Sequence, residues 1–171
     1  MAATHTRRRT AGRTPARGFG LVEALASVLL LSFCALAYAA LQLRGLAANS
    51  SAMWRTKAAV LSYEMADRVR ANRAGFSAGA YNSLTTPTAV TSCGTTSSCT
   101  PANMAALDYW TWSNAVAAQL PGGSAVVCVD STPDDGSAGS PSCDGSGTAL
   151  AVKLFWTERG SSARLTLAVR P

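Results

Sequence analysis

The chain has 171 residues, 48% of them hydrophobic, and a formal net charge of +6 at neutral pH. Five arginines precede Phe19 and no acidic residue does, so the rest of the chain carries ten basic against nine acidic side chains. The positive charge therefore belongs to the N-terminal segment. This excludes a broadly basic nucleic-acid-binding surface, and the length leaves room for only one small folded domain.

The first segment, residues 1–17, is basic, rich in Thr and Ala, and without apolar periodicity. We expect it to be removed or disordered. Positive charge immediately before a membrane span holds that flank in the cytoplasm. The sequence therefore predicts that everything after the span is exported across the inner membrane.

An apolar run of about twenty residues follows, and it contains one acid, Glu23, near its start. A charge inside hydrocarbon costs several kcal/mol unless it is paired, so an acid there indicates a function. Glu23 lies five residues after the bond between Gly18 and Phe19. Cleavage of that bond would create a free amine on Phe19, which is a natural counter-charge for Glu23 of a neighbouring copy or related subunit.

A single long helix is predicted from Phe19 to about Arg73, because no proline interrupts this stretch. Residues 19–43 are long and apolar enough to span a bilayer, and residues 44–75 form the amphipathic continuation. An apolar stripe at helical spacing should pack on the rest of the chain. The stripe is Trp54, Ala58, Leu61, Met65 and Val69.

The remaining residues, 76–171, predict an exported head domain. Residues 76–100 are typical of a loop, and residues 105–120 of a short helix that buries Leu107, Trp110 and Val116. Three apolar or alternating runs then predict a small antiparallel sheet. They are residues 125–130, 150–157 and 164–169, with a hairpin turn within residues 158–162. The predicted fold class is α+β.

Five cysteines are present, and four of them lie after the span, where an oxidising compartment favours disulfides. Four cysteines allow three connectivities, which sequence alone does not separate. We expect the two local bridges, Cys93 to Cys99 and Cys128 to Cys143. Cys34 lies in the apolar run and is predicted to be a small hydrophobic residue.

The only histidine is His5, so the exported part can form no Ser-His or Cys-His nucleophile pair and no histidine-ligated zinc site. We therefore expect no catalytic residue, no cofactor, no metal site and no enzymatic activity. Four aspartates crowd one predicted loop, but their spacing is not that of a known calcium loop. They are Asp130, Asp134, Asp135 and Asp144, and we interpret them as a solvated polar loop rather than a calcium site.

The motif at residues 18–23, Gly-Phe-Gly-Leu-Val-Glu, resembles the class III signal of type IV prepilins and of type II secretion pseudopilins. In that family a prepilin peptidase cuts after the glycine, and the new N-terminal phenylalanine is methylated. The resemblance implies that Gly18 and Phe19 are the cleavage pair and that Phe19 is the N-methylation site. It also implies that Glu23 pairs with a neighbour's N-terminus during assembly.

Residues 54–73 resemble the amphipathic helix of PilV-type minor pilins, also called type IV pilus modification proteins, and weaker similarity extends over most of the chain. The resemblance implies a pilin-like fold, in which a long N-terminal helix carries a periplasmic head. It implies a subunit that joins other minor pilins and the major pilin on the pilus assembly platform and primes assembly. It places the protein in the inner membrane as a single-pass protein, then in the cell-surface pilus.

Two alternatives remain open from sequence. One is a minor pseudopilin of type II secretion. The other is a soluble periplasmic binding domain released by ordinary signal peptidase after Ala39, because residues 37–39 form a small-residue cleavage pattern behind a basic segment.

Overall fold

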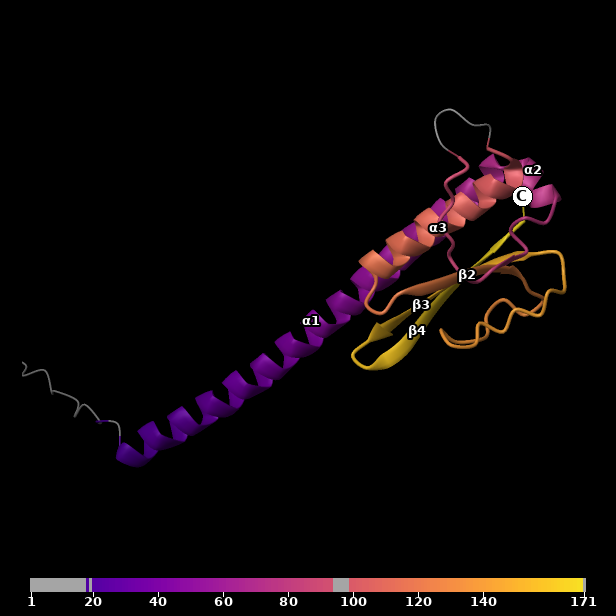
Figure 1. Ribbon diagram of the computed structural model, residues 1–171. Helices are drawn as coiled ribbons and strands as arrows, with labels where there is room; N and C mark the ends of the chain where they lie inside the picture. The colour runs from indigo at the N-terminus through magenta and orange to yellow at the C-terminus, as the bar shows by residue number, and fades with distance from the viewer. Residues whose placement is uncertain (1–17, 19, 94–98, 171) are drawn as a thin grey trace, which may run out of the picture. The chain divides into compact units, whose positions relative to one another are not determined.

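A computed structural model of the chain describes residue 18, residues 20–93 and residues 99–170. Within these residues the elements are α1 (Leu21–Ala71), α2 (Arg73–Ser77), β1 (Ser83–Leu84), α3 (Pro101–Gln119), β2 (Ser124–Val129), β3 (Leu150–Glu158) and β4 (Ser161–Val169). Figure 1 shows them in chain order. By their internal contacts the residues fall into two units, 1–46 and 47–171, which are described separately below. The predicted α+β layout of a long apolar helix, a short helix and a small antiparallel sheet is confirmed.

Helix α1 ends slightly before the predicted position. It stops at Ala71, because Asn72 leaves helical geometry with φ −99° and ψ 60°. The Asn72 side chain then accepts a hydrogen bond from the backbone N–H of Gly75 and caps the short helix α2. The predicted single helix to about Arg73 is therefore two helices, divided at Asn72.

Helix α3 begins with two residues suited to a helix start. The hydroxyl of Thr100 accepts from the backbone N–H of Asn103 at 3.2 Å, and Pro101 occupies the first turn, where its missing N–H costs nothing. The helix ends at Gln119, and the chain turns through Gly122, whose φ is +59°.

In the described part of the chain the sheet has four strands in the order β1-β2-β3-β4, and all neighbours are antiparallel. Strands β3 and β4 pair over their full length, from Leu150 opposite Val169 to Glu158 opposite Ser161. The two-residue strand β1 pairs with the end of β2, at Ser83 opposite Cys128. Strand β1 lies in the segment predicted to be a loop, so the sheet has one strand more than expected.

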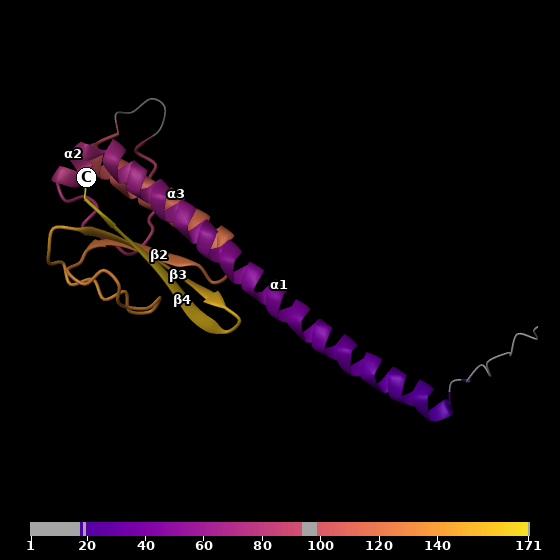
Figure 2. The same ribbon diagram turned by 180° about the vertical axis from the view of Figure 1, so that it is seen from behind.

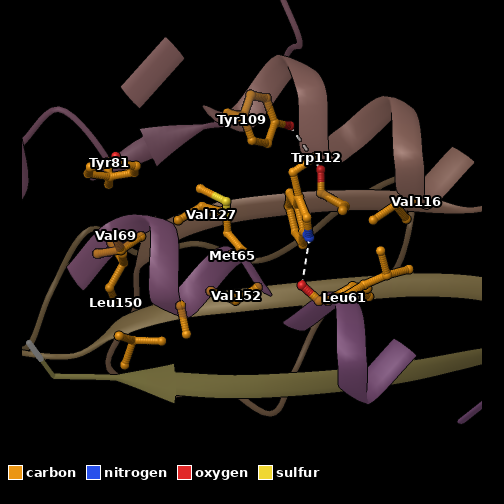
Figure 3. Packing of buried hydrophobic residues seen from close by; sticks show 14 of the residues in the cluster. Leu61, Met65, Val69, Tyr81, Tyr109, Trp112, Val116, Val127, Leu150 and Val152 are labelled. Carbon is orange, nitrogen blue, oxygen red and sulfur yellow. Dashed lines mark hydrogen bonds between the residues drawn. The ribbon is translucent and has the colours of Figure 1, made fainter. Parts of the chain in front are cut away.

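The core of residues 47–171 lies between one face of the sheet and helices α1 and α3, as Figures 1 and 2 show from opposite sides. Ala58, Leu61, Met65 and Val69 of the predicted stripe are at most 2% exposed, and Trp54 packs partly buried against them. The indole Nε1 of Trp112 donates to the backbone carbonyl of Leu61 at 2.7 Å, which ties α3 to α1 (Figure 3).

One predicted core set was partly wrong. Helix α3 buries Ala105, Tyr109, Trp112 and Val116, while Trp110 is 36% exposed and Leu107 is only half-buried. The helix therefore faces the core about one residue away from the predicted phase, because Tyr109 and Trp112 take the inward positions.

The other face of the sheet is covered by the segment that joins β2 to β3, residues 130–149, which lies away from the helices in Figures 1 and 2. A second, small hydrophobic cluster lies beneath it, formed by Val126, Cys128 and Phe155 with Cys143 packed against them. The structure joins Cys128 to Cys143 and Cys93 to Cys99 by disulfides, and Cys34 is free and exposed.

Candidate functional site

The start of α1 carries the predicted processing and assembly residues. Gly18 is described and exposed, whereas Phe19 lies outside the described residues. The carbonyl of Gly20 accepts from the backbone N–H groups of Glu23 and Ala24 at 3.0 and 3.2 Å and so opens the helix. Glu23 therefore lies in the first helical turn, where a negative charge is favourable next to the helix N-terminus.

The unit of residues 1–46 contains the apolar half of α1. Its large apolar side chains are mostly more than 58% exposed, among them Leu21 at 78% and Phe33 at 62%. An 18-residue window of α1 has a mean hydropathy of 2.2 and none of its residues is buried, so by length and composition the helix is able to cross a membrane.

Glu23 has no ion pair among the described residues. The next charged residue along the helix is Arg44, which a rise of 1.5 Å per residue places roughly 30 Å away. The two serine hydroxyls of this segment are satisfied locally, since Ser27 and Ser32 each donate to the carbonyl four residues earlier at 2.8 Å. The carboxylate of Glu23 is therefore the one charged group of residues 20–43, and no described residue pairs with it.

A second charge in an apolar run has its partners within the chain. Lys153 lies in the middle of β3, is fully buried, and points to the face covered by residues 130–149. Its ammonium is ion-paired with the fully buried Asp130 and with Asp135, the latter at 2.8 Å. It also donates to the carbonyls of Asp135 and Pro141 at 3.3 and 2.8 Å, so all its donors are used.

The electrostatics of this cluster favour the charged forms. Burial alone would lower the pKa of Lys153, but the hydrogen bonds and charges of Asp130 and Asp135 outweigh it and raise the pKa above its ordinary value. The hydrogen bond from Lys153 lowers the pKa of Asp135. The cluster fastens the covering segment to the sheet by charge as well as by the disulfide of Cys143.

The remaining aspartates of this segment also bind groups of the chain itself. Asp134 pairs with Arg164 at 3.2 Å, and Arg164 further donates to the carbonyl of Gly136 at 2.7 Å. Asp144 accepts from the Ser131 hydroxyl and from two backbone N–H groups, which lowers its pKa. Among the described residues no group of three or more His, Cys, Asp and Glu side chains could hold a metal ion.

A third polar cluster joins helices α1 and α3. The Tyr81 hydroxyl donates to Asp108 at 2.7 Å, and Arg68 lies 3.4 Å from the same carboxylate while it pairs with Glu64 at 2.7 Å. Burial and the bond to Asp108 raise the pKa of the Tyr81 hydroxyl. Arg68 therefore serves the fold, and Asp108 is an acid satisfied within its own chain.

Sequence reasoning missed Lys153. The signal was present, because a single lysine stands in the otherwise apolar run of β3, as Glu23 does in α1. The apolar run predicted a buried strand, but its charged member was not matched to the four aspartates of the neighbouring loop.

Residues 40–110 match a family model described as "Tt1218-like: Type IV pilin Tt1218". The match covers less than half of the chain, and it supports a type IV pilin and a structural, non-enzymatic subunit. No curated protein and no solved structure matches the chain. The matched residues do not include the motif at residues 18–23, so the motif and the match are separate observations that point to the same family.

Proposed function

We propose that the protein is a minor pilin of the PilV type that helps to prime assembly of a type IV pilus. Residues 1–18 are the leader, which prepilin peptidase removes, and Phe19 becomes the methylated N-terminus. Residues 19–43 anchor the subunit in the inner membrane and residues 76–171 form the periplasmic head. The subunit then joins other minor pilins and the major pilin on the assembly platform and enters the cell-surface pilus.

The observation that carries this proposal is the position of Glu23. Its carboxylate lies in the first turn of an exposed apolar helix and has no ion pair among the described residues. A free amine on Phe19 of an adjacent subunit supplies a partner of the opposite sign. Register between subunits then follows from charge, while apolar surface drives their packing.

Release of a soluble domain after Ala39 is less well supported by the geometry. Helix α1 passes through Ala39 without a break, and a cut there would divide a continuous helix. A minor pseudopilin of type II secretion shares the signal motif and differs by its assembly system.

The first test is the mature N-terminus, measured by mass spectrometry of the protein from its host. A chain that begins with N-methylated Phe19 supports the proposal. A chain that begins near Ala40 supports the secreted domain, and an intact arginine-rich segment overturns processing altogether.

The second test is the variant Glu23→Ala, assayed in cell membranes and in sheared pili. We expect a processed, membrane-bound protein that is lost from the pili, because the carboxylate that pairs with a neighbour is gone. Glu64→Gln is the matched control, since Glu64 lies on the same helix and its i,i+4 pair with Arg68 is worth only about 0.3–0.5 kcal/mol. Wild-type amounts of Glu23→Ala in the pili would overturn the assembly role.

A further inference from the structure

A polar groove of about 780 Å³ lies at the β3–β4 turn, and none of its lining residues belongs to the apolar segment of α1. It is lined by α1, by the hairpin and by the segment after β2. A pocket of about 220 Å³ adjoins it, because both are lined by Ser51, Glu158 and Arg159. The smaller pocket adds Trp54 and Pro121. Volumes of this order accommodate small organic ligands.

Two arginines of the groove form no close ion pair and no side-chain hydrogen bond within the described residues. The third arginine, Arg164, already donates hydrogen bonds to Asp134 and to the Gly136 carbonyl. Arg55 and Arg159 are exposed and have neither an ion pair nor a side-chain hydrogen bond in the described part of the chain. The neighbouring carboxylate of Glu158 accepts from the Ser51 hydroxyl and from Trp156 Nε1, both at 2.7 Å. These hydrogen bonds, and then the charges of Arg55 and Arg159, lower its pKa, so one carboxylate faces two arginines and a surplus of positive charge remains.

Arg159 also has an unfavourable backbone. Its φ is +50° and that of Gly160 is +80°, so both central residues of the two-residue hairpin turn are left-handed. Such turns favour Asn, Asp or Gly at the first position, and a long side chain there is strained. Strained residues of this kind cluster at active sites and ligand-binding sites. A second observation, independent of charge, therefore singles out the same residue.

We propose that this groove binds an acidic oligosaccharide, with Arg55 and Arg159 holding a carboxylate of the ligand. The planar guanidinium matches a carboxylate with two parallel hydrogen bonds. The hydroxyls of Ser137, Ser161 and Ser162 line the groove without side-chain partners among the described residues, and each both donates and accepts, as sugar hydroxyls require.

The adjoining pocket favours a sugar over a simple anion. Trp54, whose ring also lies under the Lys57 ammonium, and Pro121 supply apolar surface for a sugar ring in the same pocket as Glu158 and Arg159. A small inorganic anion could bind the arginines and the serines, but it would leave this apolar surface unused. The inference concerns the head alone and does not depend on assembly through Glu23.

The test is calorimetric titration of the full chain in a non-ionic detergent with a tetramer of galacturonic acid. We expect Arg55→Gln and Arg159→Gln each to weaken binding about tenfold, because each removes a charge-assisted contact. Arg73→Gln is the matched control, since Arg73 is exposed on α2 and lies outside the groove, and it should bind like the wild type.

The variant Arg159→Asn separates binding from folding. Asparagine is favoured at this turn position, so the melting temperature should rise while the affinity falls. A higher melting temperature with unchanged affinity overturns the proposal. So does equal affinity for a neutral galactose tetramer, or equal competition by inorganic phosphate, because the first would show that the acid is not recognised and the second that the sugar is not.

Discussion

Two charges of this chain stand in apolar runs, and the structure treats them in opposite ways. Lys153 in β3 is fully buried and is surrounded by two carboxylates and two carbonyls of its own chain. Glu23 in α1 is exposed among apolar side chains, and no ion pair reaches it from the described residues. A charge that is paired within its own chain stabilises the fold. A charge that is left unpaired on an apolar surface instead calls for a group of opposite charge elsewhere.

In sequence the two residues give the same signal, a single charge in an apolar run, and only the fold shows which of them is paired. A sheet brings distant residues together, so Lys153 meets Asp130 from the end of the neighbouring strand. A single long helix cannot do so, because its residues are held apart along one axis. Along the described helix no opposite charge comes nearer to Glu23 than Arg44, so its partner lies outside the described residues.

The largest effect on stability is expected for Lys153→Met. The change leaves Asp130 buried without its counter-charge, which typically costs about 3–5 kcal/mol. Unfolding of the full chain in detergent, followed by tryptophan fluorescence, measures it, because all four tryptophans lie in residues 47–171. Lys57→Met is the matched control, since Lys57 only lies over the Trp54 ring. A loss below about 1 kcal/mol for Lys153→Met would contradict the structural role of the buried pair.

The second-largest loss of stability is expected when the disulfide that joins the same segment to the sheet is removed. Replacing Cys128 and Cys143 together by serine opens a loop with a sequence separation of 15, worth about 3 kcal/mol in the chain-entropy model. The same unfolding assay checks it, with Cys34→Ser as a control that touches no disulfide. If the double variant unfolds like the control, the covering segment is held by the ion pairs alone.

A smaller loss is expected for Tyr81→Phe. The variant removes the hydroxyl that donates to the buried Asp108, while Arg68 still balances the charge. One unsatisfied buried acceptor costs about 1–3 kcal/mol, and the remaining partner keeps the effect near the lower end. An unchanged free energy of unfolding would mean that Arg68 alone suffices for Asp108.

The smallest effect is a dependence of stability on pH at the two ends of the scale. The lowered pKa of Asp135 stabilises the fold above its ordinary value of 3.8, and this contribution is lost as the pH falls through the lowered pKa. The raised pKa of Lys153 stabilises the fold below 10.5, and this contribution is lost as the pH rises through the raised pKa. The melting temperature should change little with pH near neutrality. In Lys153→Met, its fall at acid pH and its fall at alkaline pH should both be smaller. A wild-type profile in that variant would contradict the assignment.

Much of the fold could be predicted because local signals agreed. The apolar stripe of α1 and the apolar runs of β2, β3 and β4 each carry their own periodicity or length. The signal at Glu23 could also be read locally, because the anomaly is one acid in an apolar run. Its role in assembly stays a prediction.

The features that the sequence did not predict depend on tertiary contacts. Strand β1 has only two residues, and it exists because β2 offers a free edge at Cys128. The phase of α3 was misjudged because Tyr109, Trp110 and Trp112 are close in sequence, and only the hydrogen bonds of Tyr109 to Ala125 and of Trp112 to Leu61 select the buried pair. The groove residues Arg55 and Arg159 are more than a hundred positions apart and carried no shared pattern.

The most direct test of the central claim compares two properties of one variant, Glu23→Gln. The account predicts that its melting temperature stays within about 1 °C of the wild type, because Glu23 has no ion pair among the described residues of its own chain. It predicts that the amount found in sheared pili, relative to the membrane, falls at least about tenfold, because the neutral amide no longer pairs with a neighbour's amine. Incorporation at the wild-type level would contradict the claim that the partner of Glu23 is another subunit.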